Sequence, residues 1–166
     1  MSISILETKK PTSLTQRELQ ETVLEYIKQT RYATLATVRE DGAPVLRAMG
    51  SFAPDGNNIL FSTRKGAAKV QQIARNSSVS FFFQHENQKL ETFKNVAVIG
   101  HAEEVTNDLE YQRAVGILGA RNPRFKARAE RGELADTGIY LIRTTEIKYL
   151  DYARGIGAAA IQEIKL

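Results

Sequence analysis

The sequence has 166 residues, a hydrophobic fraction of 42%, a charged fraction of 25% and a formal net charge of +4. This length predicts a single domain over residues 1–166 with a hydrophobic core of its own. The absence of cysteine excludes disulfides and thiolate-ligated metals. No run approaches the roughly 18 apolar residues of a membrane helix. Residues 1–14 lack the apolar segment of a secretory signal, so we expect a loosely ordered lead-in and a cytoplasmic protein.

The first predicted element is a helix from Thr15 to about Gln29. Thr15 and Glu18 have the spacing of a capping box, in which each side chain satisfies a free backbone N–H of the other residue. Apolar residues then recur at helical spacing along one face. We expect this helix to cover one end of a sheet, and nothing in it points to chemistry.

Three strands are predicted next, over residues 32–38, 44–52 and 59–61. The dipeptides Asp41-Gly42 and Asp55-Gly56 favour tight turns between them, so the pattern predicts an antiparallel meander. Arg47 falls in the middle of the second strand. A lone arginine there is commonly solvent-exposed, although the small residues that follow it would let a flat ligand approach the backbone.

The turn after the third strand concentrates polar groups in the order Ser62, Thr63, Arg64, Lys65 and Gly66. A helical pattern begins directly afterwards, and Lys69 lies one turn inside it. Free N–H groups at a helix start, hydroxyls and lysines together suit a phosphate dianion. The alternative is an ordinary solvated loop with a helix cap, which is common before helices.

The remainder of the chain predicts three more strands and two helices. The strands are expected over residues 78–83, 92–105 and 138–150, and the helices over 107–120 and 124–133. Gly100 is expected to mark a bulge or bend in its strand. No regular element is predicted for the tail, residues 151–166. Six antiparallel strands with hairpin connections usually close into a small barrel.

Other candidate sites are weaker. His85 and His101 are the only histidines and fit no metal-binding spacing, so we expect no metal. A basic run lies near the second helix, and such runs are usually solvated helix faces, so we expect no nucleic-acid partner. Its members are Arg121, Arg124, Lys126, Arg128 and Arg131. No nucleophile triad or carboxylate pair is evident, which favours chemistry carried by a bound cofactor.

Three stretches of sequence, residues 32–52, 59–83 and 95–105, resemble the flavin-binding split-barrel family typified by pyridoxamine 5′-phosphate oxidase. The order strand, Ser-Thr, turn, Lys, helix is the most specific part, followed by a Val-x-Val-x-Gly-x-Ala-Glu strand. The resemblance implies a mainly β fold with peripheral helices, a six-stranded antiparallel split β-barrel. It also implies a homodimer with FMN in a cleft between the subunits.

The resemblance further implies a set of cofactor-binding residues. Arg47 and Lys69 would neutralise the FMN phosphate, Thr63 would donate its hydroxyl to it, and Lys65 is a weaker candidate for the same role. Ala48, Met49 and Ser62 would follow the isoalloxazine edge. Asn95 stands where the family oxidases carry a glutamine that contacts the flavin.

Several departures from the family oxidases affect the expected function. Phe52 stands where they carry a lysine for the substrate phosphate, Ala68 replaces an arginine, and Leu150 replaces a tryptophan. Their closing arginine–histidine motif is absent from residues 151–166. We therefore expect an FMN-dependent oxidoreductase, with no assigned catalytic residue, that passes hydride from a nicotinamide donor to an unidentified acceptor and is not a true pyridoxamine phosphate oxidase.

The alternatives are a haem-binding or haem-degrading relative, a deazaflavin in place of FMN, and a non-catalytic flavin-binding stress protein. Some haem-binding relatives ligate iron with a histidine in the C-terminal tail, and this tail has none, which counts against haem.

Overall fold

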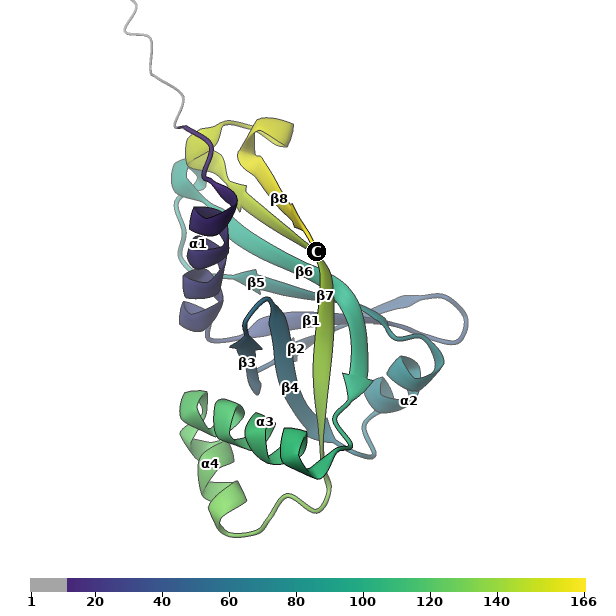
Figure 1. The fold of residues 1–166 in the computed structure, drawn as a ribbon. Coiled ribbons are helices and arrows are strands. Elements are labelled where there is room, and N and C mark those ends of the chain that lie inside the picture. Colours follow the sequence, from purple (N-terminus) through teal and green to yellow (C-terminus); the bar gives the residue numbers. More distant parts are fainter. Residues whose placement is uncertain (1–11) are drawn as a thin grey trace, which may run out of the picture.

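The computed structural model describes residues 12–166 and consists of one curled antiparallel sheet with four α-helices around it (Figure 1). The sheet follows the order β2-β1-β5-β6-β7-β4-β3, and β8 pairs with β7. The strands are β1 (Ala33–Val38), β2 (Pro44–Met49), β3 (Phe52–Asp55), β4 (Asn58–Arg64), β5 (Ser78–Gln84), β6 (Lys94–Glu104), β7 (Thr137–Asp151) and β8 (Ile161–Lys165). The helices are α1 (Gln16–Gln29), α2 (Ala68–Arg75), α3 (Asp108–Arg121) and α4 (Pro123–Glu130). The expected mainly β, curled antiparallel architecture is confirmed.

The sheet has eight strands where we expected six, and the second expected strand is in fact two. Residues 44–52 break at Gly50 and Ser51, so that β2 and β3 lie at opposite ends of the strand order although they are consecutive in sequence. The predicted meander is therefore wrong: among the described residues, β2 pairs only with β1, and β3 only with β4. Both Asp-Gly turns are present, with positive φ at Gly42 (84°) and Gly56 (61°).

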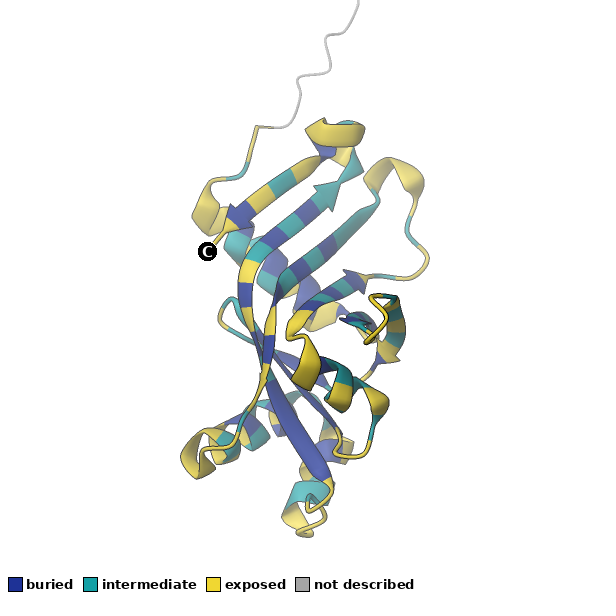
Figure 2. Ribbon diagram, turned by 90° about the vertical axis from the view of Figure 1, so that its right-hand side faces the viewer, coloured by how far each residue is buried: buried dark blue, intermediate teal, exposed yellow. Residues whose placement is uncertain are grey.

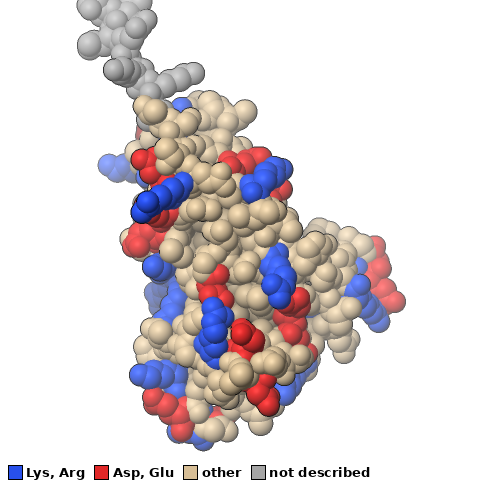
Figure 3. Space-filling model, in the orientation of Figure 1, with Lys and Arg blue, Asp and Glu red and all other residues tan. Residues whose placement is uncertain are grey.

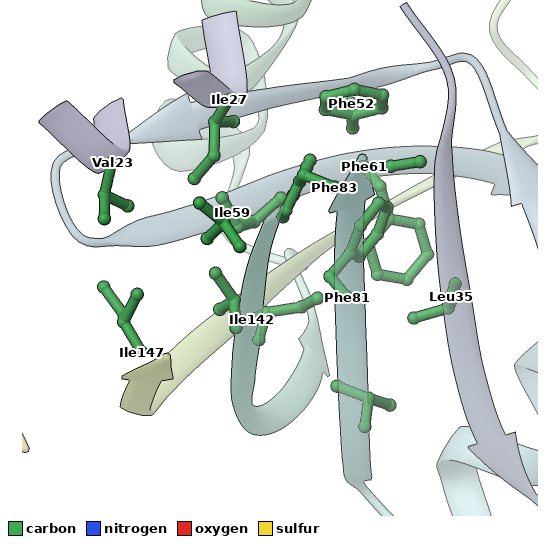
Figure 4. Close-up of a cluster of buried hydrophobic side chains, with 14 of the residues drawn as sticks. Val23, Ile27, Leu35, Phe52, Ile59, Phe61, Phe81, Phe83, Ile142 and Ile147 are labelled. Atoms are coloured by element: carbon green, nitrogen blue, oxygen red, sulfur yellow. The ribbon is translucent and has the colours of Figure 1, made fainter. Parts of the chain in front are cut away.

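The predicted capping box at the start of α1 is confirmed. Thr15 Oγ1 accepts the N–H of Glu18 at 3.2 Å, and the Glu18 carboxylate accepts the N–H of Thr15 at 2.8 Å. The apolar face of α1 packs on the sheet through Val23 and Ile27, both 3% exposed (Figure 4). The N-terminal residues 1–11 of the expected lead-in lie outside the described residues, and Arg154 donates a hydrogen bond to the Thr12 carbonyl at 2.9 Å.

The core fills the concave side of the curled sheet. Four phenylalanines from three parts of the chain meet there with no exposed surface, and their ring centroids lie 5.2–6.0 Å apart in the contacting pairs (Figure 4). They are Phe52, Phe61, Phe81 and Phe83. Buried residues alternate with less buried ones along most strands, as a sheet with one covered face requires (Figure 2).

Gly100 marks a bulge, as predicted. The register between β6 and β7 shifts between Ile99 and Gly100. A Cβ atom at Gly100 would lie 2.1 Å from the Arg143 carbonyl oxygen, so only glycine allows this close approach of the two backbones. The bulge lies within the two longest strands and allows them to bend.

The C-terminal tail is more regular than predicted. After two short 3₁₀ turns, Tyr152–Arg154 and Gly157–Ala160, the chain returns as β8 along the outer edge of β7. Ile164 pairs with Ile147 and is 1% exposed, which explains why this strand docks. Within residues 12–166, no helix combines the length and the hydropathy needed to cross a membrane.

Candidate cofactor site

Two cations, Arg47 of β2 and Lys69 in the first turn of α2, face one another at one end of the sheet. Arg47 pairs across the strands with Leu35, which has no exposed surface, so its side chain lies on the concave face. Its guanidinium donates from Nη1 to Thr37 Oγ1 at 2.8 Å and from Nη2 to Gln72 Oε1 at 3.0 Å. The alternative of a freely solvated arginine is therefore wrong.

Lys69 reaches back from α2 to the end of β4. Its Nζ donates to Thr63 Oγ1 at 2.9 Å. Thr63 is 8% exposed and lies on the last part of β4, so the hydroxyl is held in a fixed position. The helix begins at Ala68 after the N-cap residue Ala67, and no side chain of residues 12–166 accepts a hydrogen bond from its first turn. The uncapped first turn adds its partial positive charge to that of the two side chains.

The electrostatics of this pair favour an anion. Burial lowers the pKa of Arg47, and burial together with the neighbouring charge of Arg47 lowers the pKa of Lys69. Over residues 12–166, neither side chain forms an ion pair with a carboxylate. Two partly desolvated cations held side by side repel each other. A dianion bound between them would replace this repulsion by attraction to both charges.

Two residues of this cluster were missed from the sequence. Thr37 is 1% exposed, and its hydroxyl donates to Gln72 Oε1 at 2.6 Å while accepting from Arg47. Gln72 lies three residues after Lys69 on α2 and so shares its face. That spacing was the available signal for Gln72, and the position of Thr37 diagonal to Arg47 in the hairpin was the signal for Thr37.

The remaining predicted residues are placed less closely. Ser62 is 9% exposed and its hydroxyl hydrogen-bonds to that of Ser51 across the break between β2 and β3. On β2, Ala48 is exposed on the convex face, whereas Met49 is buried in the core. Lys65 is exposed, with its backbone N–H donated to the Asp136 carbonyl at 2.8 Å.

Asn95 lies apart from the cation cluster in this chain. It pairs with Gln84 and Leu150 on the convex face of the sheet, whereas Arg47 belongs to the concave face. One copy of the chain thus brings together Arg47, Thr63 and Lys69, and leaves Asn95 on the opposite side of the sheet.

The arginines of the basic run after β6 make different kinds of contact in the structure. The Arg121 guanidinium lies 4.0 Å above the Phe52 ring centroid and donates to the Phe52 carbonyl at 3.1 Å and to the Thr30 carbonyl, so it is not part of a solvated face. Arg131 pairs with Glu133 at 2.8 Å. Positive and negative side chains are interspersed over the face that carries α1 and α3 (Figure 3).

The two histidines are engaged in local contacts. The His85 ring stacks on Tyr26 with centroids 3.7 Å apart, and its Nε2 lies 3.0 Å from the Tyr26 carbonyl oxygen. His101 Nδ1 lies 3.2 Å from the Ser77 hydroxyl. Among residues 12–166 no three histidine, aspartate or glutamate side chains gather as metal ligands.

Comparison with known proteins identifies relatives. A family model described as pyridoxamine 5′-phosphate oxidase matches residues 19–151. A curated pyridoxine/pyridoxamine 5′-phosphate oxidase of Pseudomonas entomophila is 35% identical over 128 residues, which are 71% of this chain and 54% of that protein. The chain thus spans about half the length of this curated relative.

Solved structures share the fold. A heme binding protein from Mycobacterium smegmatis superposes with a TM-score of 0.72 at 15% identity, covering 92% of this chain and 60% of that one. General Stress Protein 26 from Bacillus anthracis superposes with a TM-score of 0.66 at 20% identity, covering 89% of this chain and 98% of that one. Because the family model spans most of the chain and the curled sheet agrees with these structures, this protein belongs to the pyridoxamine 5′-phosphate oxidase family.

Proposed function

We propose that this protein binds FMN and works as an oxidoreductase. The observation that carries the proposal is the pair of partly buried cations, Arg47 and Lys69, which share no carboxylate within residues 12–166 and are oriented by Thr37, Thr63 and Gln72. Hydrogen bonds between a charged side chain and a phosphate each contribute on the order of 1.5–3 kcal/mol. A phosphate monoester has the charge that this cluster lacks.

The other implied residues extend the site along the cofactor. The backbone of Ala48 and Met49 and the Ser62 hydroxyl would border the isoalloxazine ring, and Lys65 would add a further cation near the phosphate. Bound FMN would supply hydride and electron transfer, for which no side-chain acid or base is required. The chain's own part is to hold the phosphate and orient the ring. We propose a nicotinamide donor and a small-molecule acceptor.

The structure of Phe52 supports a substrate other than pyridoxamine phosphate. Phe52 stands where the family oxidases carry a substrate lysine, and its ring is buried among Phe81 and Phe83. The Arg121 guanidinium covers that ring and donates to the Phe52 carbonyl. A phenylalanine carries no charge, and this one is buried, so it cannot bind a substrate phosphate as the lysine does.

We also propose that the site is completed in a homodimer. The convex face of the sheet carries Ala48, Thr34, Phe82 and Ala97 in one paired row, all of them partly or fully exposed. Leu46 on the same face is 69% exposed. Asn95 lies on this face too. Because β2 is an edge strand, a ring that borders its backbone would reach the convex face, where a second copy would place its Asn95.

The test is flavin retention by the Arg47→Ala/Lys69→Ala double variant. Losing two charged contacts should raise the Kd for FMN by about a hundredfold or more. The Arg17→Ala/Arg131→Ala variant removes the same charge from exposed, paired arginines and should bind FMN as the wild type does. Quenching of FMN fluorescence on titration measures both values.

The spectrum and mass of the released chromophore decide among the alternatives. A two-banded flavin spectrum supports the proposal, a single Soret band indicates haem, and a mass matching a deazaflavin replaces FMN by that cofactor. An unchanged Kd in the double variant would refute the phosphate assignment. Bleaching of the bound flavin by NADPH under anaerobic conditions distinguishes the oxidoreductase from a non-catalytic flavin-binding protein.

A further inference from the structure

A groove of about 560 Å³ lies beside the cation cluster, between the turn that joins β1 to β2 and the outer face of α2 (Figure 1). Ala68, Gln71, Gln72 and Arg75 line the groove from the helix, and residues 39–41 line it from the turn. These four helix positions are spaced as neighbours on one helical face. A phosphate alone would fill a small part of this volume, which lies in the range of pockets that hold whole small molecules.

Gln72 joins the groove to the cation cluster. Its Oε1 accepts a hydrogen bond from Arg47 Nη2 at 3.0 Å and another from the Thr37 hydroxyl at 2.6 Å. Because a guanidinium can only donate, the amide atom that faces Arg47 must be the oxygen. The orientation of the amide is therefore fixed, and within residues 12–166 no group accepts a hydrogen bond from Gln72 Nε2. Gln72 thus offers two N–H donors to a ligand in the groove that it lines.

The start of α2 supplies further donors at the same place. Ala68 is the first residue of the helix, and it lines the groove with a side chain too small to close it. No side chain of residues 12–166 caps this helix, so its first backbone N–H groups stay open to a ligand. A chain of two phosphates that begins between Arg47 and Lys69 would meet these N–H groups and the Gln72 amide as it enters the groove.

The far end of the groove carries balanced charge. Arg75 forms an ion pair with Glu40, and Arg39 Nε lies 3.1 Å from Asp41 Oδ1. Two cations and two carboxylates leave no net charge, so this end does not favour a polyanionic tail. A guanidinium that is paired through its edge keeps its flat faces free to stack on an aromatic ring. The two carboxylates can accept hydrogen bonds from the hydroxyls of a sugar. A neutral nucleoside therefore suits this end.

We propose that this groove binds the adenylate half of a dinucleotide flavin, so that the protein holds FAD more tightly than FMN. The phosphate on the flavin side would lie between Arg47 and Lys69, and the second phosphate would accept hydrogen bonds from Gln72 Nε2. The adenosine would lie against Arg75, which ends α2 about 10 Å along the helix axis from Ala68. A ribose and a purine can span that length.

This inference rests on the proposed flavin function, because it extends the same cofactor beyond its phosphate. The diphosphate bridge of FAD carries two negative charges, as the phosphate dianion of FMN does. The cation cluster alone therefore accepts either cofactor, and the groove decides between them.

The experiment titrates the flavin-free protein with FAD and with FMN and measures both Kd values by calorimetry. We expect FAD to bind at least about tenfold more tightly than FMN. Gln71→Trp would fill the groove from an exposed position, and Arg75→Ala would remove the stacking surface. Each substitution should weaken the binding of FAD toward that of FMN and leave the Kd for FMN unchanged.

Two matched controls place the same changes elsewhere. Gln112→Trp adds the same bulk at an exposed position of α3, and Arg17→Ala removes an exposed, paired arginine of α1. Both variants should keep the preference for FAD.

Equal Kd values for FAD and FMN in the wild type, or a preference for FAD that survives in both groove variants, would overturn the inference and leave the proposed FMN function standing. Loss of FMN binding in Gln71→Trp would also overturn it, since the groove would then belong to the FMN site itself. A wild type that binds neither flavin would overturn the proposed function together with this inference.

Discussion

At the scale of single residues, the Lys69 ammonium makes the site sensitive to pH. Burial and the charge of Arg47 hold the pKa of Lys69 below its ordinary value in the free protein. A bound phosphate would favour the protonated form, so binding takes up a proton wherever Lys69 is partly neutral. We expect the affinity for FMN to fall as the pH rises through the lowered pKa of Lys69. Equilibrium titrations of FMN across the alkaline range measure this.

The Lys69→Arg variant is the matched control, because arginine keeps its charge and should flatten the alkaline pH dependence. The same lowered pKa affects stability without FMN. Between the folded pKa and the ordinary value of about 10.4, the unfolded chain binds more protons, so the free energy of unfolding should rise with pH over that window. A wild-type affinity that stays constant over this range would contradict the assignment of Lys69.

The sequence predicted part of the cation cluster at this scale. Arg47, Thr63 and Lys69 were identified and lie together, because their order along the chain matches the strand, turn and helix that position them. Thr37 and Gln72 were not identified. Their hydrogen bond depends on how α2 docks against the β1–β2 hairpin, and neither local propensity nor periodicity specifies that contact.

At the scale of elements, Gly100 determines how β6 and β7 bend around the core. A Cβ atom there would collide with the Arg143 backbone, which has no flexible end to move aside. We expect Gly100→Ala to destabilise the protein by about 1–3 kcal/mol or more, as overpacking does. Chemical denaturation gives the free energy of unfolding.

The same substitution at Gly116 serves as the comparison. Gly116 lies within α3, and beyond its own helix backbone no atom of residues 12–166 lies within 4 Å of the position its Cβ would occupy. Alanine should stabilise the helix there by about 0.5–1 kcal/mol. If both substitutions changed stability in the same direction and by similar amounts, the bulge would not be the constraint that we describe.

Most elements were predictable because their signals are local. The capping box, the Asp-Gly turns and the bulge at Gly100 all follow from residue types at short spacing. The break at Gly50 and Ser51 was missed because the alternating side-chain pattern of residues 44–52 continues through it. Nothing in that pattern indicates that the chain passes from one edge of the sheet to the other. The strand β8 was missed because it carries a single buried residue, Ile164, which gives no periodic signal in the sequence.

At the scale of the whole molecule, the proposed dimer predicts a change of mass on altering the convex face. Leu46→Glu would place a charge at the centre of the proposed interface, where it would lose its water on association. We expect a wild-type dimer, a monomeric variant, and weakened FMN binding in that variant because the partner's contribution is lost. Light scattering after size-exclusion chromatography measures the mass.

Leu109→Glu is the matched control, since Leu109 is 82% exposed on α3 and lies outside the convex face. It should leave both mass and FMN affinity unchanged. A wild-type monomer that binds FMN fully would refute the shared site. A Leu46→Glu variant that is still a dimer would show that the interface lies on another surface.

The strand order also has a consequence for synthesis on the ribosome. In the part of the chain that the structure describes, the hairpin of β3 and β4 has one sheet neighbour beyond itself, β7, which begins at Thr137. The hairpin of β1 and β2 joins the sheet through β5 instead. Until the last fifth of the chain emerges, the two N-terminal hairpins belong to separate pieces of sheet, joined covalently by the short crossing at Gly50 and Ser51 and by the segment that contains α2. Nascent chains that stall before residue 137 should therefore expose the apolar side of β4 to chaperones.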